Sequence, residues 1–562
     1  MELDEGQRRV VDGAPGDRRM VTAGPGAGKT STAVALIASV LDRVGDDAMV
    51  LFVSFSNAAI DAALDSMTDL DDSHGERVMA MTLDSLAAQL VDDEPVAGRQ
   101  PDFTRRLTRA TEQVIASDGE DLSSIAYLIV DEAQDMSAER CAFLLAVIAA
   151  MPASSGFTIF GDPWQAIYSF GGAEGTTSAW GALYDDLNVR ESRLLMLDLD
   201  GEYRARSTQV RRIASSLSDA RSSSIGRDIV EERLEEALIH TVGTNFDRLQ
   251  RSLLGWRGGA TILAWRNSEV LDIVDAIRRH GIQCDRIEPV GSSKPRIAPW
   301  VAELFYDTGG RSFDVSDFDD FCDNHPEVRP DWFRTLAYAI EAVSAKLAWP
   351  MIAHMMQRDH VRSRPWYQPP AAVAVSTIHQ SKGREFDNVV IANPDRLLRP
   401  PTGEPQLELL YVALTRAHDR VLTLSWEAPW SEDVPGTHTR IRKLPGRRRP
   451  SAISVVSADA RRTRAVGGRR GQEVLATAQT GDLVSFERLN STEMPVYRLV
   501  LSGEAVGVTT EQFGEVVKRV CRDRWPALGP IPLEGVETIV SAGVELDFSL
   551  QPRLAGFSDL TF

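Results

Sequence analysis

A glycine-rich turn between an apolar strand and an apolar helix constrains this chain more than any other feature. Residues 22–32 read TAGPGAGKTST, and the helical pattern AVALIASVL follows them. Glycines let the backbone curl so that its N–H groups point at phosphate oxygens, and the helix N-terminus adds its positive dipole end. The order of strand, loop and helix therefore predicts a P-loop, in which Lys29 reaches the β- and γ-phosphates and the Thr30 hydroxyl binds Mg²⁺. Ala23 stands where the usual G-x-x-x-x-G-K-[ST] pattern has its first glycine.

Two carboxylates follow a second apolar run. The run IAYLIV at residues 125–130 continues directly into DEAQD. In P-loop proteins an acidic residue at the end of such a strand holds Mg²⁺, and a neighbouring group positions the attacking water. We therefore expect Asp131 to bind the metal ion and Glu132 to activate water.

Three further apolar runs end in polar loops. They are MVLFVSF at residues 49–55, VMAMT at 78–82 and GFTIF at 156–160. Short continuous apolar runs suit strands that are buried on both faces of a parallel sheet. Their alternation with helical patterns predicts a doubly wound α/β fold with its ligands at the carboxyl ends of the strands.

Composition limits the function classes. The 562 residues predict roughly three to five domains. The net charge of −20 argues against a general polyanion-binding surface, although local grooves decide binding. The four cysteines lie far apart, which argues against a zinc ribbon and a disulfide framework and favours buried thiols. With no long apolar run and no signal peptide, we expect a cytoplasmic protein without a membrane partner.

The order of these motifs resembles the superfamily 1 DNA helicases of the UvrD/Rep/PcrA type. The resemblance implies an α/β protein with two RecA-like P-loop NTPase domains, each built on a parallel sheet, with a small helical insertion and a C-terminal α+β domain. It also implies ATP and Mg²⁺ as cofactors. The nucleotide-binding residues that it implies are Gln7, Gly26, Ala27, Gly28, Lys29, Thr30, Ser31, Tyr203 and Glu385.

The same resemblance assigns roles in hydrolysis. Gln7 would read the adenine and Tyr203 would stack on it, Glu385 would bind the ribose, and Thr30 and Asp131 would be the metal ligands. The catalytic set is Lys29, Glu132, Gln165 as a γ-phosphate sensor, and the arginine fingers Arg204 and Arg416. Two guanidinium groups that reach one phosphate would stabilise the charge on the transferring phosphoryl group.

Single-stranded DNA is the partner that the resemblance implies. Aromatic side chains suit this role because every base has a π-face on which a ring can stack. The DNA-binding residues implied are Phe55, Asn57, Thr82, Tyr168, Phe170, Thr377 and His379.

The chain departs from the family pattern at three places. Asp84 replaces the usual His after Thr82, and Gly171 replaces an Arg that normally follows the stacking aromatic. Leu407 and Glu408 replace basic residues before the last motif. The loss at Gly171 removes one link between the acidic ATPase motif and DNA.

The predicted domains follow the motif order. They are residues 1–186 as motor domain 1 with a short insertion near 86–124, 187–260 as the start of motor domain 2, 261–370 as its continuation with a small helical insertion, 371–435 as its end, 436–470 as a basic linker, and 471–562 as a C-terminal α+β accessory domain. The linker is read either as a solvated tether or as an extra DNA-backbone contact.

The expected function is that of an ATP-dependent DNA helicase or translocase. The resemblance implies movement 3′ to 5′ on single-stranded DNA, or on a duplex with a single-stranded tail, in DNA repair, recombination or phage defence. One alternative is a translocase that unwinds only with a partner, which the short insertions favour. Another is an ATP-gated DNA-binding switch for a nuclease or repair factor bound through residues 471–562.

Overall fold

The computed structural model describes most of the chain. The described residues are 3–54, 60, 63–64, 77–91, 103–117, 120–167, 179–191, 193–218, 226–253, 255–256, 258–287, 297–330, 332–333, 346–357, 373–427, 431–444, 446, 449–461, 468–489, 493–522, 524–542 and 546–562. They form two units, Met1–Gly243 with Ser381–Leu424 (unit 1) and Thr244–Gln380 with Ser425–Phe562 (unit 2).

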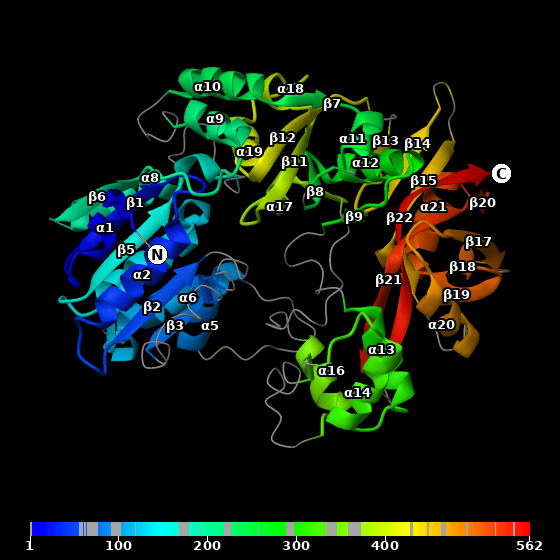
Figure 1. The fold of residues 1–562 in the computed structure, drawn as a ribbon, viewed down its shortest axis with the longest axis horizontal. Helices are drawn as coiled ribbons and strands as arrows, with labels where there is room; N and C mark the ends of the chain where they lie inside the picture. The colour runs from blue at the N-terminus through cyan, green and yellow to red at the C-terminus, as the bar shows by residue number, and fades with distance from the viewer. Residues whose placement is uncertain are drawn as a thin grey trace. The chain divides into compact units, whose positions relative to one another are not determined.

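Unit 1 contains a six-stranded sheet in the order β3-β2-β4-β5-β1-β6, and every pairing in it is parallel (Figure 1). Its strands are β1 (Arg18–Ala23), β2 (Met49–Ser54), β3 (Val78–Thr82), β4 (Ile125–Asp131), β5 (Gly156–Gly161) and β6 (Leu194–Leu199). This sheet confirms the predicted α/β fold.

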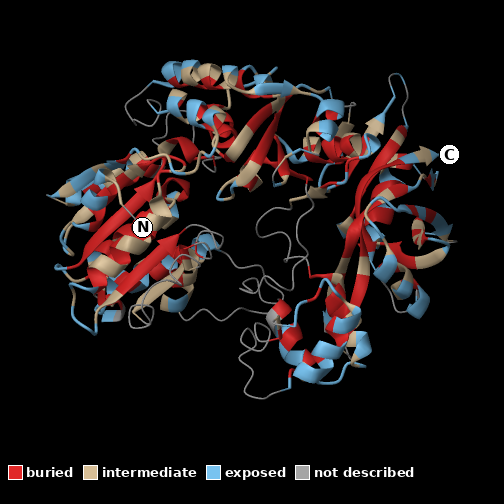
Figure 2. Cartoon of the chain, viewed as in Figure 1, coloured by how far each residue is buried: buried red, intermediate tan, exposed pale blue. Residues whose placement is uncertain are grey.

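Helices cover both faces of this sheet. α1 (Glu5–Val11) and α2 (Lys29–Leu41) contribute to one apolar cluster, and α5 (Leu83–Leu90), α6 (Phe103–Ala116), α7 (Ala138–Ala150) and α8 (Ala179–Arg190) contribute to another. The central strands are mostly buried, as Figure 2 shows in red. Burial on both faces explains why these strands are continuous apolar runs in the sequence.

β6 corrects one predicted boundary. The sequence places residues 187–260 at the start of the second motor domain, but β6 pairs with β1 at the edge of the first sheet, with Met20 opposite Met196. The prediction is wrong for this strand because strand order in a parallel sheet does not follow chain order.

The second parallel sheet has six strands, which are distributed over the two units. In unit 1 the order is β7 (Val242–Thr244), β12 (Ala417–Leu424) and β11 (Phe386–Ala392), with α9 (Thr208–Ser216), α10 (Arg227–Ile239), α18 (Asp395–Leu398) and α19 (Leu407–Leu414) around them. In unit 2 the order is β8 (Ala260–Ala264), β10 (Val373–Thr377) and β9 (Asp285–Arg286), with α11 (Phe246–Leu253), α12 (Asn267–Arg279) and α17 (Ile378–Ser381). A second parallel sheet confirms the two-sheet motor architecture.

Unit 2 also contains a ten-stranded antiparallel sheet. Its strands are β13 (Ser431–Asp433), β14 (Arg440–Lys443), β15 (Pro450–Val456), β16 (Ala460–Arg461), β17 (Leu483–Leu489), β18 (Val496–Leu501), β19 (Glu504–Thr509), β20 (Ala527–Leu528), β21 (Ile531–Ala542) and β22 (Leu546–Thr561). α20 (Gly468–Thr477) contacts β19 and β22, and α21 (Glu511–Cys521) contributes to the same apolar cluster.

Strands β14 to β16 contradict the predicted linker. The composition of residues 436–470 suggests a tether, yet Ile441 and Ile453 are buried opposite each other in the antiparallel sheet. Arg440 is buried too, in an ion pair with Asp433 at 2.7 Å. Arg440, one of the arginines of this segment, therefore belongs to folded structure.

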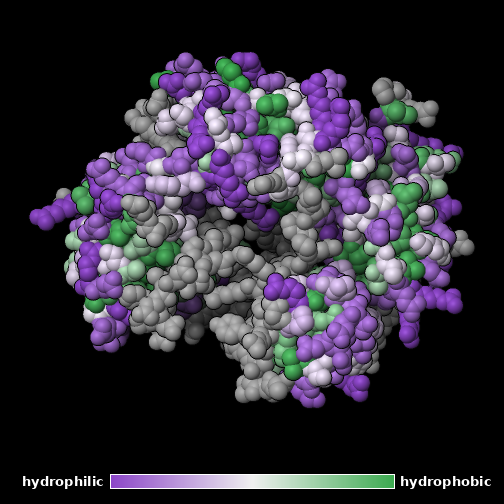
Figure 3. All heavy atoms as spheres, viewed as in Figure 1, coloured by the Kyte–Doolittle hydropathy of each residue, from purple (hydrophilic) through white to green (hydrophobic). Residues whose placement is uncertain are grey.

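The helical insertion and the C-terminal sheet share one core. α13 (Pro299–Asp307), α14 (Val315–Asn324) and α16 (Trp349–Gln357) lie in the same apolar cluster as the long hairpin β21–β22. The ring of Phe548 lies 5.0 Å from that of Phe305 and 4.8 Å from that of Trp349. The surface of this helical group that Figure 3 displays is largely hydrophilic.

All four cysteines are buried and free, as the sequence predicts. Among the described residues, no helix combines the length and apolar character that a membrane crossing requires.

Candidate functional site

The P-loop lies between β1 and α2, where the sequence predicts it. Gly26 and Gly28 adopt positive φ angles of 77° and 79°. A Cβ atom on Gly28 would stand 2.5 Å from Nε2 of Gln7, and one on Gly26 would stand 2.5 Å from a carboxylate oxygen of Glu202. Both glycines are therefore required by backbone conformation and by close approach. The predicted residues Gly26, Ala27, Gly28, Lys29, Thr30 and Ser31 form this loop and the first turn of α2.

Gln7 and Tyr203 flank Gly28. Gln7 is buried, and its amide donates to the carbonyl of Ala27 at 3.5 Å. The backbone N–H of Tyr203 donates to the carbonyl of Gly26 at 2.9 Å, and its hydroxyl donates to the carboxylate of Asp4. This hydrogen bond raises the pKa of Tyr203 to about 12. The two residues expected to contact adenine thus both lie close to Gly28 of the P-loop.

Lys29 faces a cluster of carboxylates. Its ammonium lies 3.5 Å from Glu132, and Glu132, Asp131 and Asp162 together raise its pKa although burial lowers it. Burial and the adjacent Glu132 raise the pKa of Asp131. The pKa of Glu132 is lowered because the charges of Lys29 and Lys382 outweigh the effect of burial. Glu132 is therefore the carboxylate that stays ionised beside Lys29.

Glu132 has a left-handed backbone conformation, with φ of 55°. Its N–H donates to Asp131 at 2.9 Å, and its carboxylate accepts a hydrogen bond from Gln134. The other end of the Gln134 amide accepts from the N–H of Asp162 at 3.1 Å. Gln134 thus fixes Glu132 relative to the end of β5, a role that the sequence interpretation did not assign to it.

Gln165 follows β5 in the short helix η3 (Pro163–Gln165). Its amide donates to Asp162 at 2.8 Å, and its carbonyl oxygen accepts from the guanidinium of Arg416 at 2.9 Å. Arg416 also donates to the backbone carbonyl of Val412 at 3.2 Å. Burial and the nearby Arg204 lower the pKa of Arg416 to about 10, so it is charged at neutral pH. The predicted phosphate sensor and one predicted finger are in direct contact.

Arg204 is held beside Arg416. Its guanidinium donates to the carbonyl of Thr415 at 2.5 Å and pairs with Glu385. His418 lies 3.3 Å from the second oxygen of Glu385. The structure therefore brings both predicted fingers and the predicted ribose ligand into one cluster within unit 1.

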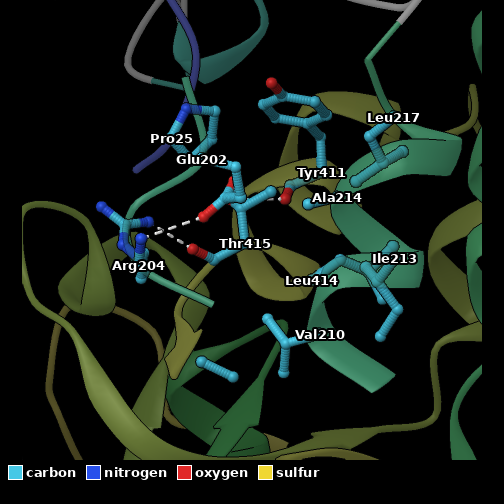
Figure 4. A pocket seen from close by; sticks show the side chains of 11 residues that line it. Pro25, Glu202, Arg204, Val210, Ile213, Ala214, Leu217, Tyr411, Leu414 and Thr415 are labelled. Atoms are coloured by element: carbon cyan, nitrogen blue, oxygen red, sulfur yellow. Dashed lines mark hydrogen bonds between the residues drawn. The ribbon is translucent and has the colours of Figure 1, made fainter. Parts of the chain in front are cut away.

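An apolar pocket underlies Arg204 (Figure 4). Val210 and Ile213 of α9, Leu217 just after it and Leu414 of α19 line the pocket, together with Pro25 of the P-loop. Arg204 itself forms part of the pocket wall, next to Glu202 and Thr415.

Lys382 lies inside this network and was not given a role from sequence. Its ammonium donates to Asp135 and to the backbone carbonyl of Gln165, and both side chains of the ion pair are almost fully buried. Burial raises the pKa of Asp135 to about 7 and lowers that of Lys382, while their contact opposes both shifts. Lys382 follows His379 by three residues in the chain and contacts Asp135 of the acidic motif.

The donor set suits Mg²⁺. Thr30 and Asp131 offer the oxygen ligands that this ion prefers, and the mutual repulsion of Asp131 and Glu132 leaves negative charge that a cation would neutralise. These residues therefore fit the ion that the motifs imply.

The predicted DNA contacts divide into two groups. Phe55, Asn57, Tyr168 and Phe170 lie outside the described residues. Thr82 and Thr377 stand at the carboxyl ends of β3 and β10, where their hydroxyls accept from the N–H groups of Ser85 and Gln380. His379 is half-buried in α17.

Three residues at the end of β8 were missed. Trp265, Arg266 and Asn267 follow the strand, and the guanidinium of Arg266 stacks over the Trp265 ring at 4.4 Å. Asn267 accepts a hydrogen bond from Gln380 at 3.1 Å. An aromatic ring beside an arginine after an apolar strand is a signal that a sequence reading can detect.

Asp84, the departure from the family pattern, has a partner. Arg140 of α7 pairs with it at 2.7 Å, and both side chains are about one-fifth exposed. The pair links the first turn of α5 to the helix that follows the acidic motif.

Comparison with known proteins gives two family matches. Residues 7–171 match an AAA domain, and residues 372–423 match a UvrD-like helicase C-terminal domain. No curated protein matches the chain. Among solved structures, a Pif1 helicase from Candida albicans is 15% identical, with a TM-score of 0.35, over 76% of this chain and 96% of that one. The two family matches, in this order along the chain, confirm the resemblance to superfamily 1 helicases of the UvrD type.

Proposed function

We propose, from the UvrD-type helicase architecture of this chain, that it is a motor that hydrolyses ATP to move along single-stranded DNA. The observation that supports this most is a connected network of side chains suited to phosphoryl transfer: Lys29, Glu132, Gln165, Arg204 and Arg416. Movement 3′ to 5′, unwinding of tailed duplexes, and a role in DNA repair, recombination or phage defence are parts of the proposal that rest on the family resemblance.

The roles in hydrolysis follow from charge and position. Lys29 neutralises the β- and γ-phosphates, and Glu132, ionised between two lysines, accepts a proton from the attacking water. Bound Mg²⁺ would supply further charge neutralisation, with Thr30 and Asp131 holding it. Arg204 and Arg416 stabilise the charge that develops on the transferring group.

Gln165 is suited to couple hydrolysis to DNA. Its neutral amide oxygen accepts a hydrogen bond from the guanidinium of Arg416. A guanidinium forms a stronger hydrogen bond with an anionic phosphate oxygen than with an amide oxygen. We infer that γ-phosphate binding separates this pair. Because Tyr168 and Phe170 follow Gln165 by three and five residues, a shift of η3 would reach the rings proposed to stack on bases.

The decisive measurement is ATP hydrolysis with and without single-stranded DNA, at low and physiological salt. Strong stimulation, lost in Lys29→Ala, is expected. Hydrolysis that ignores DNA would contradict the motor and favour an ATP-gated switch. Helicase assays on duplexes with a 3′ or a 5′ tail then test polarity.

A partner-dependent translocase is the second candidate. Gly171 stands where an arginine normally links the acidic ATPase motif to DNA. The Asp84–Arg140 ion pair is a different connection to the helix that follows the acidic motif. A motor with altered coupling would hydrolyse ATP and translocate, yet separate strands only with a nuclease or repair partner. Stimulated hydrolysis without unwinding would favour this candidate.

A further inference from the structure

Helix α12 begins at the candidate nucleic-acid edge of unit 2. It follows β8 through Trp265 and Arg266 and starts at Asn267. β8 pairs in parallel with β10, so that Ala264 lies opposite Thr377. The start of α12 is therefore placed by the same strand ends that carry the proposed DNA contacts.

The middle of α12 is held by Arg442 of β14. The two ends of its guanidinium pair with Asp272 at 2.8 Å and Asp275 at 2.9 Å. The same guanidinium lies 3.7 Å from the centre of the Phe557 ring, and its side chain is only 14% exposed. Such a planar fork, with one face against an aromatic ring, holds its two carboxylate partners in one geometry.

A second buried cluster fixes the last turn of α12. Glu534 of β21 is fully buried, with Arg278 of α12 at 3.5 Å, Arg286 of β9 at 3.3 Å and Arg553 of β22 at 3.0 Å. Arg278 also donates to the carbonyl of Ala555 at 2.5 Å.

The two buried clusters act on adjacent turns of the helix. Asp272, Asp275 and Arg278 are spaced three residues apart, so neighbouring members lie on adjacent turns, and all three contact strands of the antiparallel sheet. Breaking a buried pair by removing one partner is strongly unfavourable, because the other charge stays buried. The helix therefore cannot tilt or slide without disrupting the sheet.

We propose that the antiparallel sheet positions the DNA-binding edge of unit 2 through α12, and that Arg442 and Glu534 are positioning residues for DNA-stimulated ATP hydrolysis. The inference rests on the proposed motor function and deepens it. It gives the sheet a role that needs no docked partner.

The test uses the full chain and the variants Arg442→Met and Arg442→Lys. The probe is an oligo(dT) strand, and the readouts are the strand concentration at half-maximal ATPase stimulation, the maximal stimulated rate, and the thermal midpoint. Arg442→Met should raise the half-saturating concentration about tenfold, because misplaced contacts lose affinity steeply. Arg442→Lys keeps one charge contact and should recover part of the loss. The control is Arg498→Met, which breaks an exposed pair with Glu487 on β17 and β18 and should change nothing.

The outcomes separate the two proposals. A wild-type enzyme without DNA stimulation contradicts the motor itself. The positioning role alone is overturned if DNA stimulates the wild type and the Arg442→Met variant folds but needs the same oligo(dT) concentration for half-maximal stimulation. It is also overturned if Arg442→Met lowers the basal and the stimulated ATPase rates equally. If Arg442→Met fails to fold, the variant Asp275→Asn replaces it in the test. In this variant Arg442 keeps its pair with Asp272, and the oligo(dT) concentration at half-maximal stimulation again decides.

Discussion

Glu132 is strained where chemistry is expected. A non-glycine residue with φ of 55° is uncommon, and such conformations persist only where the surroundings hold them. Here the carboxylate of Asp131 accepts a hydrogen bond from the N–H of Glu132, and the amide of Gln134 donates one to the carboxylate of Glu132. The strain directs the carboxylate toward Lys29 rather than into the sheet.

Glu132→Gln should abolish turnover while leaving ATP binding intact. The amide cannot accept the proton, so a loss of about 10² to 10⁴ in kcat is expected. Steady-state hydrolysis and equilibrium binding of a fluorescent ATP analogue measure the two effects. Glu139→Gln, an exposed change in the next helix, is the matched control. Retained turnover would refute the assignment of the base.

Lys382→Met should destabilise the protein as well as inactivate it. The change leaves Asp135 buried without its cation, and breaking a buried pair costs about 3–5 kcal/mol. Urea unfolding measures the loss. The double variant Lys382→Met/Asp135→Asn removes both charges and should regain most of the stability without regaining ATPase activity. Equal instability of the two variants would show that the pair is not the source of the effect.

At the scale of elements, a pH-sensitive pair joins the turn between β13 and β14 to the turn between β15 and β16. His438 lies 2.8 Å from Asp459, whose other oxygen accepts from the N–H of Val456. The hydrogen bond to Asp459 raises the pKa of His438, although burial and the charge of Arg286 lower it. Because the folded pKa exceeds the unfolded value, the stabilisation is full below about pH 6.5 and is lost as pH rises through the folded pKa.

His438→Gln should therefore lower the thermal midpoint more at pH 6 than at pH 8. The side chain is 41% exposed, so solvent screening keeps the effect below about 1 kcal/mol. Thermal unfolding at both pH values, with exposed His354→Gln as the control, measures it. An identical loss at both pH values would mean that the imidazole acts only through packing.

The sequence predicted local elements well and long-range pairing poorly. The P-loop and the acidic motif are local patterns, and they lie where the spacing places them. β6 was misplaced because nothing in residues 194–199 encodes that they pair with β1, far back in the chain. Residues 440–456 were misread because arginine, proline and glycine suggest a linker, whereas buried acids such as Asp272 turn Arg442 into part of a core. Lys382 and Gln134 were missed because their partners are set by the tertiary fold.

At the scale of the whole molecule, net charge limits how DNA can be held. With a formal charge of −20, the chain has little long-range attraction for phosphates, so we expect base stacking and a few local contacts to carry affinity. The exposed arginines of α20 are already paired, Arg469 with Glu473 at 3.1 Å and Arg470 with Glu504 at 3.9 Å. Each arginine therefore has a carboxylate beside it that offsets part of its attraction for phosphates.

This argument predicts a shallow salt dependence. Each phosphate contact with a single strand contributes about −0.7 to the slope of log affinity against log salt, so three contacts would lower affinity only about tenfold to twentyfold between 50 and 200 mM salt. The double variant Arg469→Gln/Arg470→Gln should leave that slope unchanged. If the slope instead became shallower by about 1.4, both arginines would be phosphate contacts. The basic stretch would then be a DNA-binding element of an otherwise acidic motor.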